Sequence, residues 1–256
     1  MKDKQTVTRA NEPVIRVDAF KKAYQNEIAV DGLSFTLESG QVLGMIGPNG
    51  AGKTTTLRAI AGILPSSAGS IAVSGFDVDD HPLDVKKITA YVPDDPQLFN
   101  DLTVEQHFAF TASVYEVPGW QSSMEEILLR FDLTTKRKKR ASELSRGMRQ
   151  KLAIGCAYLF NPQALLLDEP MTGLDPKGIR VLKKTIEERA KRGDAIIISS
   201  HLLAMVEDIC THVMILELGQ KKFFGSIEEL KQQFASESGD EAGSLEDFFF
   251  NAVQHN

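Results

Sequence analysis

The stretch Gly47–Thr55 constrains this sequence more than any other. It reads GPNGAGKTT and meets every fixed position of the phosphate-binding pattern G-x-x-x-x-G-K-[ST]. The apolar run Val42–Ile46 before it predicts a buried strand, and the residues after Thr55 predict the first turns of a helix. A glycine-rich loop between a strand and a helix points backbone N–H groups and the helix N-terminus at one place. We therefore predict a polyphosphate site within an α/β fold, rather than a glycine-rich turn without a ligand.

Two side chains of this loop can act on a bound nucleotide. Lys53 is expected to pair with the β- and γ-phosphates, and the hydroxyl group of Thr54 is expected to bind Mg²⁺. The candidate nucleotide-binding residues of the loop are Gly47, Pro48, Asn49, Gly50, Ala51, Gly52, Lys53, Thr54 and Thr55.

Length and composition narrow the classes of protein. A chain of 256 residues can bury a full core, and its formal net charge of -6 argues against a general nucleic-acid-binding surface. The two cysteines, Cys156 and Cys210, have no metal-ligand spacing, which favours reduced thiols in the cytosol. Met1–Glu12 lacks the apolar segment of a secretory signal, and no apolar run approaches the roughly 20 residues of a membrane span. Any membrane-spanning helices are therefore expected on another chain.

Strand and helix patterns alternate along most of the sequence. Val14–Phe20 alternates apolar and polar residues like a half-buried strand, and strands joined by a turn at Asp31 and Gly32 are expected next, after Tyr24 in a polar loop. Residues 164–167 and 195–198 are fully apolar and predict buried strands separated by a helix, the second strand running to Ser199. Such alternation predicts a mostly parallel sheet that is covered on both faces.

The pattern becomes helical between about residues 95 and 150. Thr103 and Gln106 have the spacing of a capping box, and Ser122–Glu125 has the spacing of a second one. We interpret this region as a helical lobe inserted into the α/β core.

Three segments are expected along the chain. Residues 1–12 are predicted to form a flexible tail and residues 13–230 the folded domain. Residues 231–256 are predicted to form an acidic C-terminal extension, because acidic and small residues predominate there.

Asp168, Glu169 and His201 are candidates for hydrolytic chemistry. Asp168 ends an apolar strand, which is where phosphate-loop proteins place the carboxylate that holds Mg²⁺. Glu169 follows at once and could orient or deprotonate a water, although a helix N-cap pair is the structural alternative. His201 lies just past another strand end, where open α/β sheets bind ligands.

With the phosphate loop, further motifs closely resemble the nucleotide-binding subunit of an ABC transporter. They are Leu144–Met148 (LSRGM), Leu165–Pro170 (LLLDEP), Gly173–Asp175 (GLD) and His201, in the family's order and at about its spacings. The resemblance runs from about Val14 to Leu230. It implies a P-loop NTPase (RecA-like) core with a mostly parallel sheet, an N-terminal antiparallel β subdomain and an inserted helical subdomain.

The resemblance also implies roles for single residues. Tyr24 matches the aromatic residue that stacks on adenine, and Thr55 would lie near the α-phosphate. Asp168 matches the Walker B carboxylate and Glu169 the general base. His201 matches the switch histidine that contacts the γ-phosphate, and Asp175 belongs to the loop that bridges two subunits. The catalytic residues implied are Glu169, His201 and Lys53.

The signature Ser145–Met148 is expected to act across a dimer. In this family the Ser145 hydroxyl and the Gly147 N–H would close over the γ-phosphate held by a second subunit. ATP would then hold the dimer together, and hydrolysis would let it open. The second subunit could be another copy or a relative.

The sequence departs from the family pattern at several positions. Arg146 stands where the signature usually has Gly, and Met148 where it has Gln; both variants resemble the export-type (ABC-2 or multidrug-like) branch. Asp94 stands where the family has a Gln that senses Mg²⁺ and couples to the transmembrane partner, while Gln97 is nearby but out of register. The metal ligands expected are Thr54, Asp168 and, through water, Asp94.

The function expected is that of an ATP-binding and ATP-hydrolysing subunit that powers an ABC transporter, an exporter, by ATP-driven dimerisation. ATP and Mg²⁺ are the cofactors implied. A separate transmembrane permease chain is the expected partner, at the cytoplasmic face of the membrane, and no nucleic acid is expected. The alternative is a soluble ABC ATPase that acts as a mechanical switch on a non-membrane partner, for example in cluster assembly. A regulatory module without hydrolysis is the weaker alternative, because Glu169 and His201 are both present.

Overall fold

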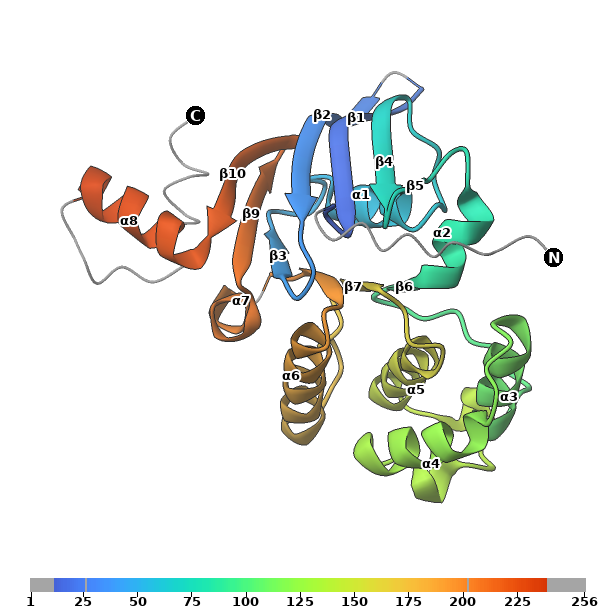
Figure 1. Ribbon diagram of the computed structural model, residues 1–256. Helices are drawn as coiled ribbons and strands as arrows, with labels where there is room; N and C mark the ends of the chain where they lie inside the picture. Colours follow the sequence, from blue (N-terminus) through green and yellow to red (C-terminus); the bar gives the residue numbers. More distant parts are fainter. Residues whose placement is uncertain (1–11, 26, 202, 239–256) are drawn as a thin grey trace.

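The computed structural model describes residues 12–25, 27–201 and 203–238. Two sheets with helices around them form the upper part of Figure 1, and a group of helices forms the lower part. The strands are β1 (Ile15–Tyr24), β2 (Glu27–Leu37), β3 (Val42–Ile46), β4 (Ala68–Val73), β5 (Phe76–Asp77), β6 (Thr89–Val92), β7 (Ala164–Asp168), β8 (Ala195–Ser199), β9 (His212–Glu217) and β10 (Gln220–Ser226). The helices are α1 (Lys53–Ile60), α2 (Pro82–Ile88), α3 (Val104–Val114), α4 (Trp120–Arg130), α5 (Arg146–Leu159), α6 (Pro176–Lys191), α7 (Leu203–Ile209) and α8 (Ile227–Ser238), with short 3-10 turns at Thr134–Lys136 and Ala141–Glu143.

The larger sheet carries the site. Its strand order is β10-β9-β3-β8-β7-β6, and every neighbouring pair is parallel except β9 with β10. The central strands β3, β7 and β8 are buried along their whole length, as their unbroken apolar sequences predict. Because these strands run in one direction, their carboxyl ends meet at one edge, where Asp168 pairs in register with Ser199. The prediction of a mostly parallel sheet is confirmed.

The smaller sheet is antiparallel, with strand order β2-β1-β4-β5, as expected for the N-terminal subdomain. β2 is one strand, so the turn predicted at Asp31 and Gly32 is wrong. Between the pairs Phe20–Leu33 and Lys22–Val30, β2 holds one more residue than β1, which makes a bulge. Gly32 lies in this bulge with φ of +69°, a conformation that glycine adopts without strain.

The helices α3, α4 and α5 pack together below the larger sheet in Figure 1. The capping box at Thr103 is confirmed: its hydroxyl accepts from Gln106 N, and the Gln106 side chain accepts from Thr103 N. The box predicted at Ser122 is wrong, because α4 already begins at Trp120 after Gly119. Trp120 is partly buried against the core, and this packing accounts for the earlier start.

The larger sheet separates two hydrophobic cores. Residues of one strand alternate between them: Val42 and Ile46 face the core shared with the helical lobe, and Leu43 and Met45 face the core shared with the antiparallel sheet. The sheet that carries the site is therefore held from both faces.

The two expected tails are described only in part. Residues 1–11 and 239–256 lie outside the described residues, and the boundary expected after residue 230 falls within α8. Within the described ranges, no helix combines the length and the apolar character needed to cross a bilayer.

Candidate nucleotide-binding and catalytic site

The phosphate loop joins β3 to α1, as predicted, and two of its glycines are sterically required. Gly52 is the N-cap of α1 with φ of +100°, and a Cβ there would lie 2.7 Å from the carbonyl oxygen of Ala29. A Cβ on Gly47 would lie 2.3 Å from the carbonyl oxygen of Leu216. The loop therefore packs against β2 and β9 through bare backbone, which side chains at these positions would prevent.

Lys53 is buried within the loop that it ends. Its Nζ donates to the carbonyl oxygens of Gly47, at 2.6 Å, and Pro48, at 3.1 Å. Burial lowers the pKa of Lys53, while the charges of Glu169 and Asp168 oppose this effect. The two carbonyl groups accept two of the three ammonium hydrogens without neutralising the charge, so the environment suits an incoming anion.

Asp168 forms the junction between the loop and the neighbouring strands. Its Oδ2 accepts from the hydroxyls of Thr54, at 2.8 Å, and Tyr91, at 3.2 Å, and its Oδ1 accepts from Ser199 Oγ at 2.5 Å. Burial is the main cause that raises the pKa of Tyr91 to about 12, so this hydroxyl stays a donor at neutral pH. The carboxylate is thereby fixed beside the phosphate loop.

Sequence reasoning missed Tyr91 and Ser199. Ser199 ends β8 as Asp168 ends β7, and Tyr91 lies one residue before the end of β6. Polar residues at the ends of neighbouring apolar strands are the signal that could have found them, once the strand order is known.

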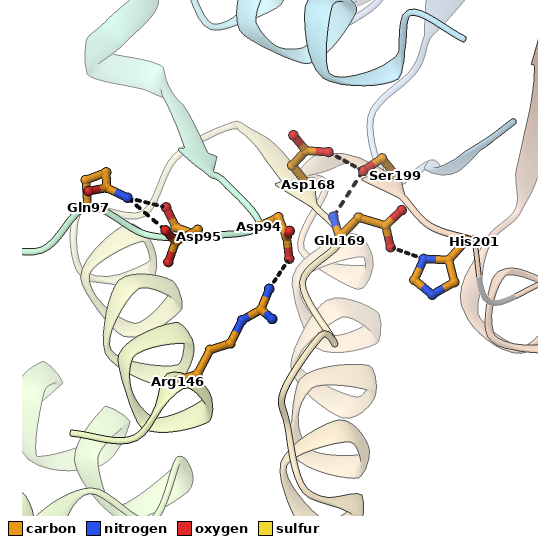
Figure 2. A network of polar contacts seen from close by, with 8 residues as sticks. All are labelled: Asp94, Asp95, Gln97, Arg146, Asp168, Glu169, Ser199 and His201. Carbon is orange, nitrogen blue, oxygen red and sulfur yellow. Dashed lines mark hydrogen bonds and ion pairs between the residues drawn. The ribbon is translucent and has the colours of Figure 1, made fainter. Parts of the chain in front are cut away.

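Glu169 and His201 form a hydrogen-bonded pair next to Asp168 (Figure 2). His201 Nδ1 lies 2.8 Å from Glu169 Oε2, and Glu169 N donates to Ser199 Oγ at 3.0 Å. Glu169 has φ of +46°, a left-handed conformation that is strained for a residue with a side chain. Burial raises the pKa of Glu169, and His201 opposes the rise. Strain and hydrogen bonding together fix this carboxylate, a combination that is frequent at catalytic positions.

Asp94 lies beside this group but has another partner. Its Oδ1 is 3.0 Å from Nη2 of Arg146, and Figure 2 shows the carboxylate turned towards that guanidinium. Gln97 donates to the carboxylate of Asp95 at 3.0 Å. Two of the three expected metal ligands, Thr54 and Asp168, are therefore hydrogen-bonded to each other. The third, Asp94, is bonded to Arg146 instead, and the role of Asp94 as a metal ligand stays a prediction.

A cleft of about 480 Å³ lies at the phosphate loop, and Gly47, Pro48 and His201 are not among the residues that line it. Tyr24 lines it, together with Asn49–Thr55 of the loop, Asp94, Asp168 and Glu169. Its size is in the range of small-molecule sites. The prediction that Tyr24 lies in a loop is wrong, because it ends β1; the residue is 44% exposed at the cleft.

Ser145, Gly147 and Asp175 do not line this cleft. Ser145 is the N-cap of α5, and its Oγ accepts from Met148 N at 3.3 Å. A Cβ on Gly147 would lie 2.3 Å from the carbonyl oxygen of Gly173, so the first turn of α5 packs against the loop after β7. Lys151 Nζ pairs with Asp175 Oδ1 at 2.7 Å, which lowers the pKa of Asp175. The signature and the loop containing Asp175 are therefore neighbours.

Comparisons with known proteins agree with this geometry. The family model described as "ABC transporter" matches residues 30–172. The chain is 33% identical to the ABC-type transporter ATP-binding protein EcsA of Bacillus subtilis (strain 168), over 90% of this chain and 93% of that protein. It is 34% identical to the Nod factor export ATP-binding protein I of Paraburkholderia xenovorans (strain LB400), over 82% of this chain and 70% of that protein.

A solved structure described as the ATP-binding subunit of an ABC transporter has the same fold. It superimposes with a TM-score of 0.89 at 30% identity, over 94% of this chain and all of that one. Both the sequence family and the fold are thus those expected from the motifs. The chain belongs to the ABC transporter family, as its ATP-binding subunit.

Proposed function

We propose that this chain hydrolyses ATP with the help of Mg²⁺ and thereby powers an ABC transporter of the export type. One observation carries the proposal. A strained, partly buried Glu169 is hydrogen-bonded to His201, directly after an Asp168 carboxylate that is bonded to Thr54 of the phosphate loop. This arrangement combines a candidate base, a metal ligand pair and a phosphate site in one cleft.

The residues present fit Mg²⁺ bound together with a nucleotide. In the described part of the chain, no group of three or more His, Cys, Asp or Glu side chains could hold a metal by itself. Mg²⁺ is commonly held by one or two carboxylates together with substrate phosphates. The Thr54 hydroxyl and the Asp168 carboxylate, 2.8 Å apart, suit that mode. When bound, the ion would neutralise charge that develops on the phosphate oxygens.

Phosphate binding, proton transfer and adenine binding are assigned to different residues. Lys53 and the loop amides hold the phosphates, and Glu169 accepts a proton from the attacking water. A raised pKa makes Glu169 a stronger base than an ordinary carboxylate. His201 holds Glu169 in place and reaches the γ-phosphate, and Tyr24 stacks on the adenine.

The signature acts on the nucleotide of a second subunit. Ser145 and Gly147 lie outside the cleft of their own chain, at the N-terminus of α5, where the helix dipole and backbone N–H groups suit an anion. Asp175 forms an ion pair with Lys151 of the same helix, α5, so it would face the same partner subunit. Each chain carries one set of motifs, so two chains are needed to form two complete sites.

The helical lobe is the proposed docking surface for a transmembrane permease at the cytoplasmic face. Phe99 and Phe110 are about half exposed, and their rings lie 5.1 Å apart; Val114 is also exposed nearby on α3. Exposed apolar side chains that gather at one place suit a protein partner. The direction of transport is inferred from relatives that are named for Nod factor export and linearmycin resistance.

The first test is size-exclusion chromatography with light scattering on Glu169→Gln, with and without ATP. We expect loss of turnover by more than 100-fold, retained ATP binding, and a dimer that forms only with ATP. Glu228→Gln, in the first turn of α8, is the matched control and should hydrolyse ATP like the wild type. Turnover by Glu169→Gln near the wild-type rate would refute the assigned base.

The partner is tested by co-purification of the full chain from detergent-solubilised membranes. Recovery of an integral membrane chain supports the transporter. Recovery of a soluble partner alone would favour the mechanical switch instead. Loss of the membrane chain upon Phe99→Asp, with ATP hydrolysis retained, would locate the docking surface.

A further inference from the structure

Asp94 and Arg146 are two positions at which this sequence departs from its family pattern, and they pair with each other. They are 52 residues apart in sequence, on the loop after β6 and the first residue of α5. Oδ1 and Nη2 lie 3.0 Å apart, and the side chains are 46% and 54% exposed (Figure 2). An ion pair this exposed contributes little to folding, so its effect must be sought in local orientation.

Arg146 has an unfavourable place on its own helix. A positive charge in the first turn is repelled by the positive end of the helix dipole. The first turn of α5 contains no acidic residue that could compensate. The carboxylate of Asp94, supplied by another loop, lies at this helix end and provides the missing negative charge.

The aliphatic part of Arg146 contacts a second loop. A Cβ built on Gly173 would lie 3.4 Å from both Cγ and Cδ of Arg146. Gly147 packs against the same residue, because its own Cβ would lie 2.3 Å from the Gly173 carbonyl oxygen. Arg146 is therefore held between the loop that contains Asp94 and the loop that contains Gly173 and Asp175.

We propose that Asp94 is a positioning residue that, through Arg146, sets the orientation of the first turn of α5 against the loop 171–175. This inference rests on the proposed function, because that turn presents Ser145 and Gly147 to the nucleotide of the second subunit. Asp94 also lines the nucleotide cleft, so the pair connects a chain's own cleft to the turn that meets its partner's nucleotide. Without Asp94, the charge of Arg146 would be uncompensated at the helix end. Without Arg146, the charge of Asp94 would be uncompensated beside the incoming phosphates.

A charge-reversal cycle tests the pair directly. The variants are Arg146→Asp, Asp94→Arg and the double variant, each as the full chain. Lys139→Ala is the matched control, because Lys139 and Glu143 form a similarly exposed pair at 2.9 Å in the same lobe. Hydrogen exchange is measured for peptides that cover residues 144–152 and 171–175, without nucleotide.

We expect exchange of residues 144–152, and in the same direction of residues 171–175, to be at least threefold faster in Asp94→Arg, which places two positive charges at this helix end, and to return towards the wild-type rate in the double variant. The control should not change it. Unchanged exchange in Asp94→Arg, or no recovery in the double variant, would overturn the proposal. If Asp94→Arg does not fold, Asp94→Asn serves in its place, with the same expected direction.

The functional consequence is measured in the Glu169→Gln background. We expect Arg146→Asp to raise the ATP concentration for half-maximal dimerisation about tenfold. This shift should exceed any change in the affinity of the monomer for a fluorescent ATP analogue, because Arg146 itself does not line the cleft, although Asp94, which loses its cation, does. An unchanged ATP requirement for dimerisation would overturn the proposed consequence.

Failure of the proposed function would give a different result from failure of the positioning role of Asp94. If Glu169→Gln alone does not dimerise with ATP, pairing of two identical copies is refuted, and the second subunit must be a relative. Hydrogen exchange of the monomer then decides the positioning role by itself, because it does not depend on a second subunit.

Discussion

His201 Nδ1 and Glu169 Oε2 lie 2.8 Å apart, so the imidazole is the direct hydrogen-bond partner of the candidate base. Burial alone would raise the pKa of Glu169 strongly, since a buried carboxylate disfavours its charge. The charge and the hydrogen bond of His201 oppose that rise. The histidine therefore favours the ionised form of Glu169, in addition to any contact with the γ-phosphate.

His201→Ala should move the acid limb of the pH–rate profile to higher pH. The base must be ionised to act, so activity falls as pH decreases through its pKa. Without His201 the pKa of Glu169 rises further, and the fall begins at a higher pH. Steady-state phosphate release between pH 5 and 9 measures the limb. His81→Ala is the control, because His81 is an exposed histidine before α2. An acid limb at the wild-type position in His201→Ala would contradict the assignment.

Thr54→Val should raise the Mg²⁺ concentration for half-maximal activity at least tenfold. The substitution keeps the shape of the side chain but removes the hydroxyl that bonds to Asp168. Hydrogen bonds to charged groups are worth about 1.5–3 kcal/mol, which corresponds to a tenfold or larger effect. ATP binding without Mg²⁺, measured by calorimetry in EDTA, should change less than threefold. Thr54→Ser, which retains the hydroxyl, should resemble the wild type, and an unaltered Mg²⁺ requirement in Thr54→Val would exclude this role.

The sequence predicted the position of the site because parallel strands share an edge. Asp168 and His201 follow apolar strands directly, so their proximity to the phosphate loop follows from the sheet alone. The start of α3 after Thr103 could also be predicted, because the residues of a capping box lie within one helical turn of each other.

Features that depend on packing were not predictable in the same way. The pairing of Asp94 with Arg146 links segments 52 residues apart and leaves no periodic signal. Tyr91 and Ser199 became visible as partners of Asp168 only through the order of β6, β7 and β8. Likewise, burial of Trp120 moved the start of α4 ahead of the serines that resembled a cap.

Tyr24→Ala should raise the KM for ATP about tenfold and leave kcat nearly unchanged. Stacking of a base on an aromatic ring is worth about 1–3 kcal/mol, and Tyr24 lines the cleft at the end of β1. A ring that stacks on adenine would contact it equally before and during hydrolysis, so the loss should fall on binding. Tyr24→Phe should preserve KM. A lowered kcat at saturating ATP would instead place Tyr24 among the groups that act in the transition state.

Gly147→Ala should abolish ATP-driven dimerisation in the Glu169→Gln background. The new Cβ would lie 2.3 Å from the carbonyl oxygen of Gly173, so the first turn of α5 or the loop after β7 must move. Both are backbone, and neither can yield as a flexible side chain would. Binding of ATP to the monomer should stay within threefold, because Gly147 lies outside the cleft. Normal dimerisation of the variant would show that this turn does not contact the partner's nucleotide.

The last prediction concerns stability, at the buried pair of Arg189 and Asp194. Nε and Oδ2 lie 2.8 Å apart, although not in hydrogen-bond geometry, and Arg189 also donates to the Pro162 carbonyl oxygen at 3.0 Å. Burial lowers the pKa of Arg189 and raises the pKa of Asp194. Removal of one partner leaves the other charge buried, so Arg189→Met should lower the free energy of unfolding by about 3–5 kcal/mol at neutral pH.

The loss in Arg189→Met should shrink as the pH falls. Without the guanidinium, the pKa of Asp194 rises further above its value in the unfolded chain. Below that raised pKa the folded state binds a proton more strongly than the unfolded state does, so acidification restores part of the stability. Urea unfolding at pH 7.5 and 5.5 measures both values, and Arg189→Met with Asp194→Leu should recover most of the loss at pH 7.5. Lys183→Met, which breaks a more exposed pair with Asp208, should cost less than about 1 kcal/mol. A deficit in Arg189→Met that stays constant with pH would mean that lost packing, rather than the stranded carboxylate, dominates.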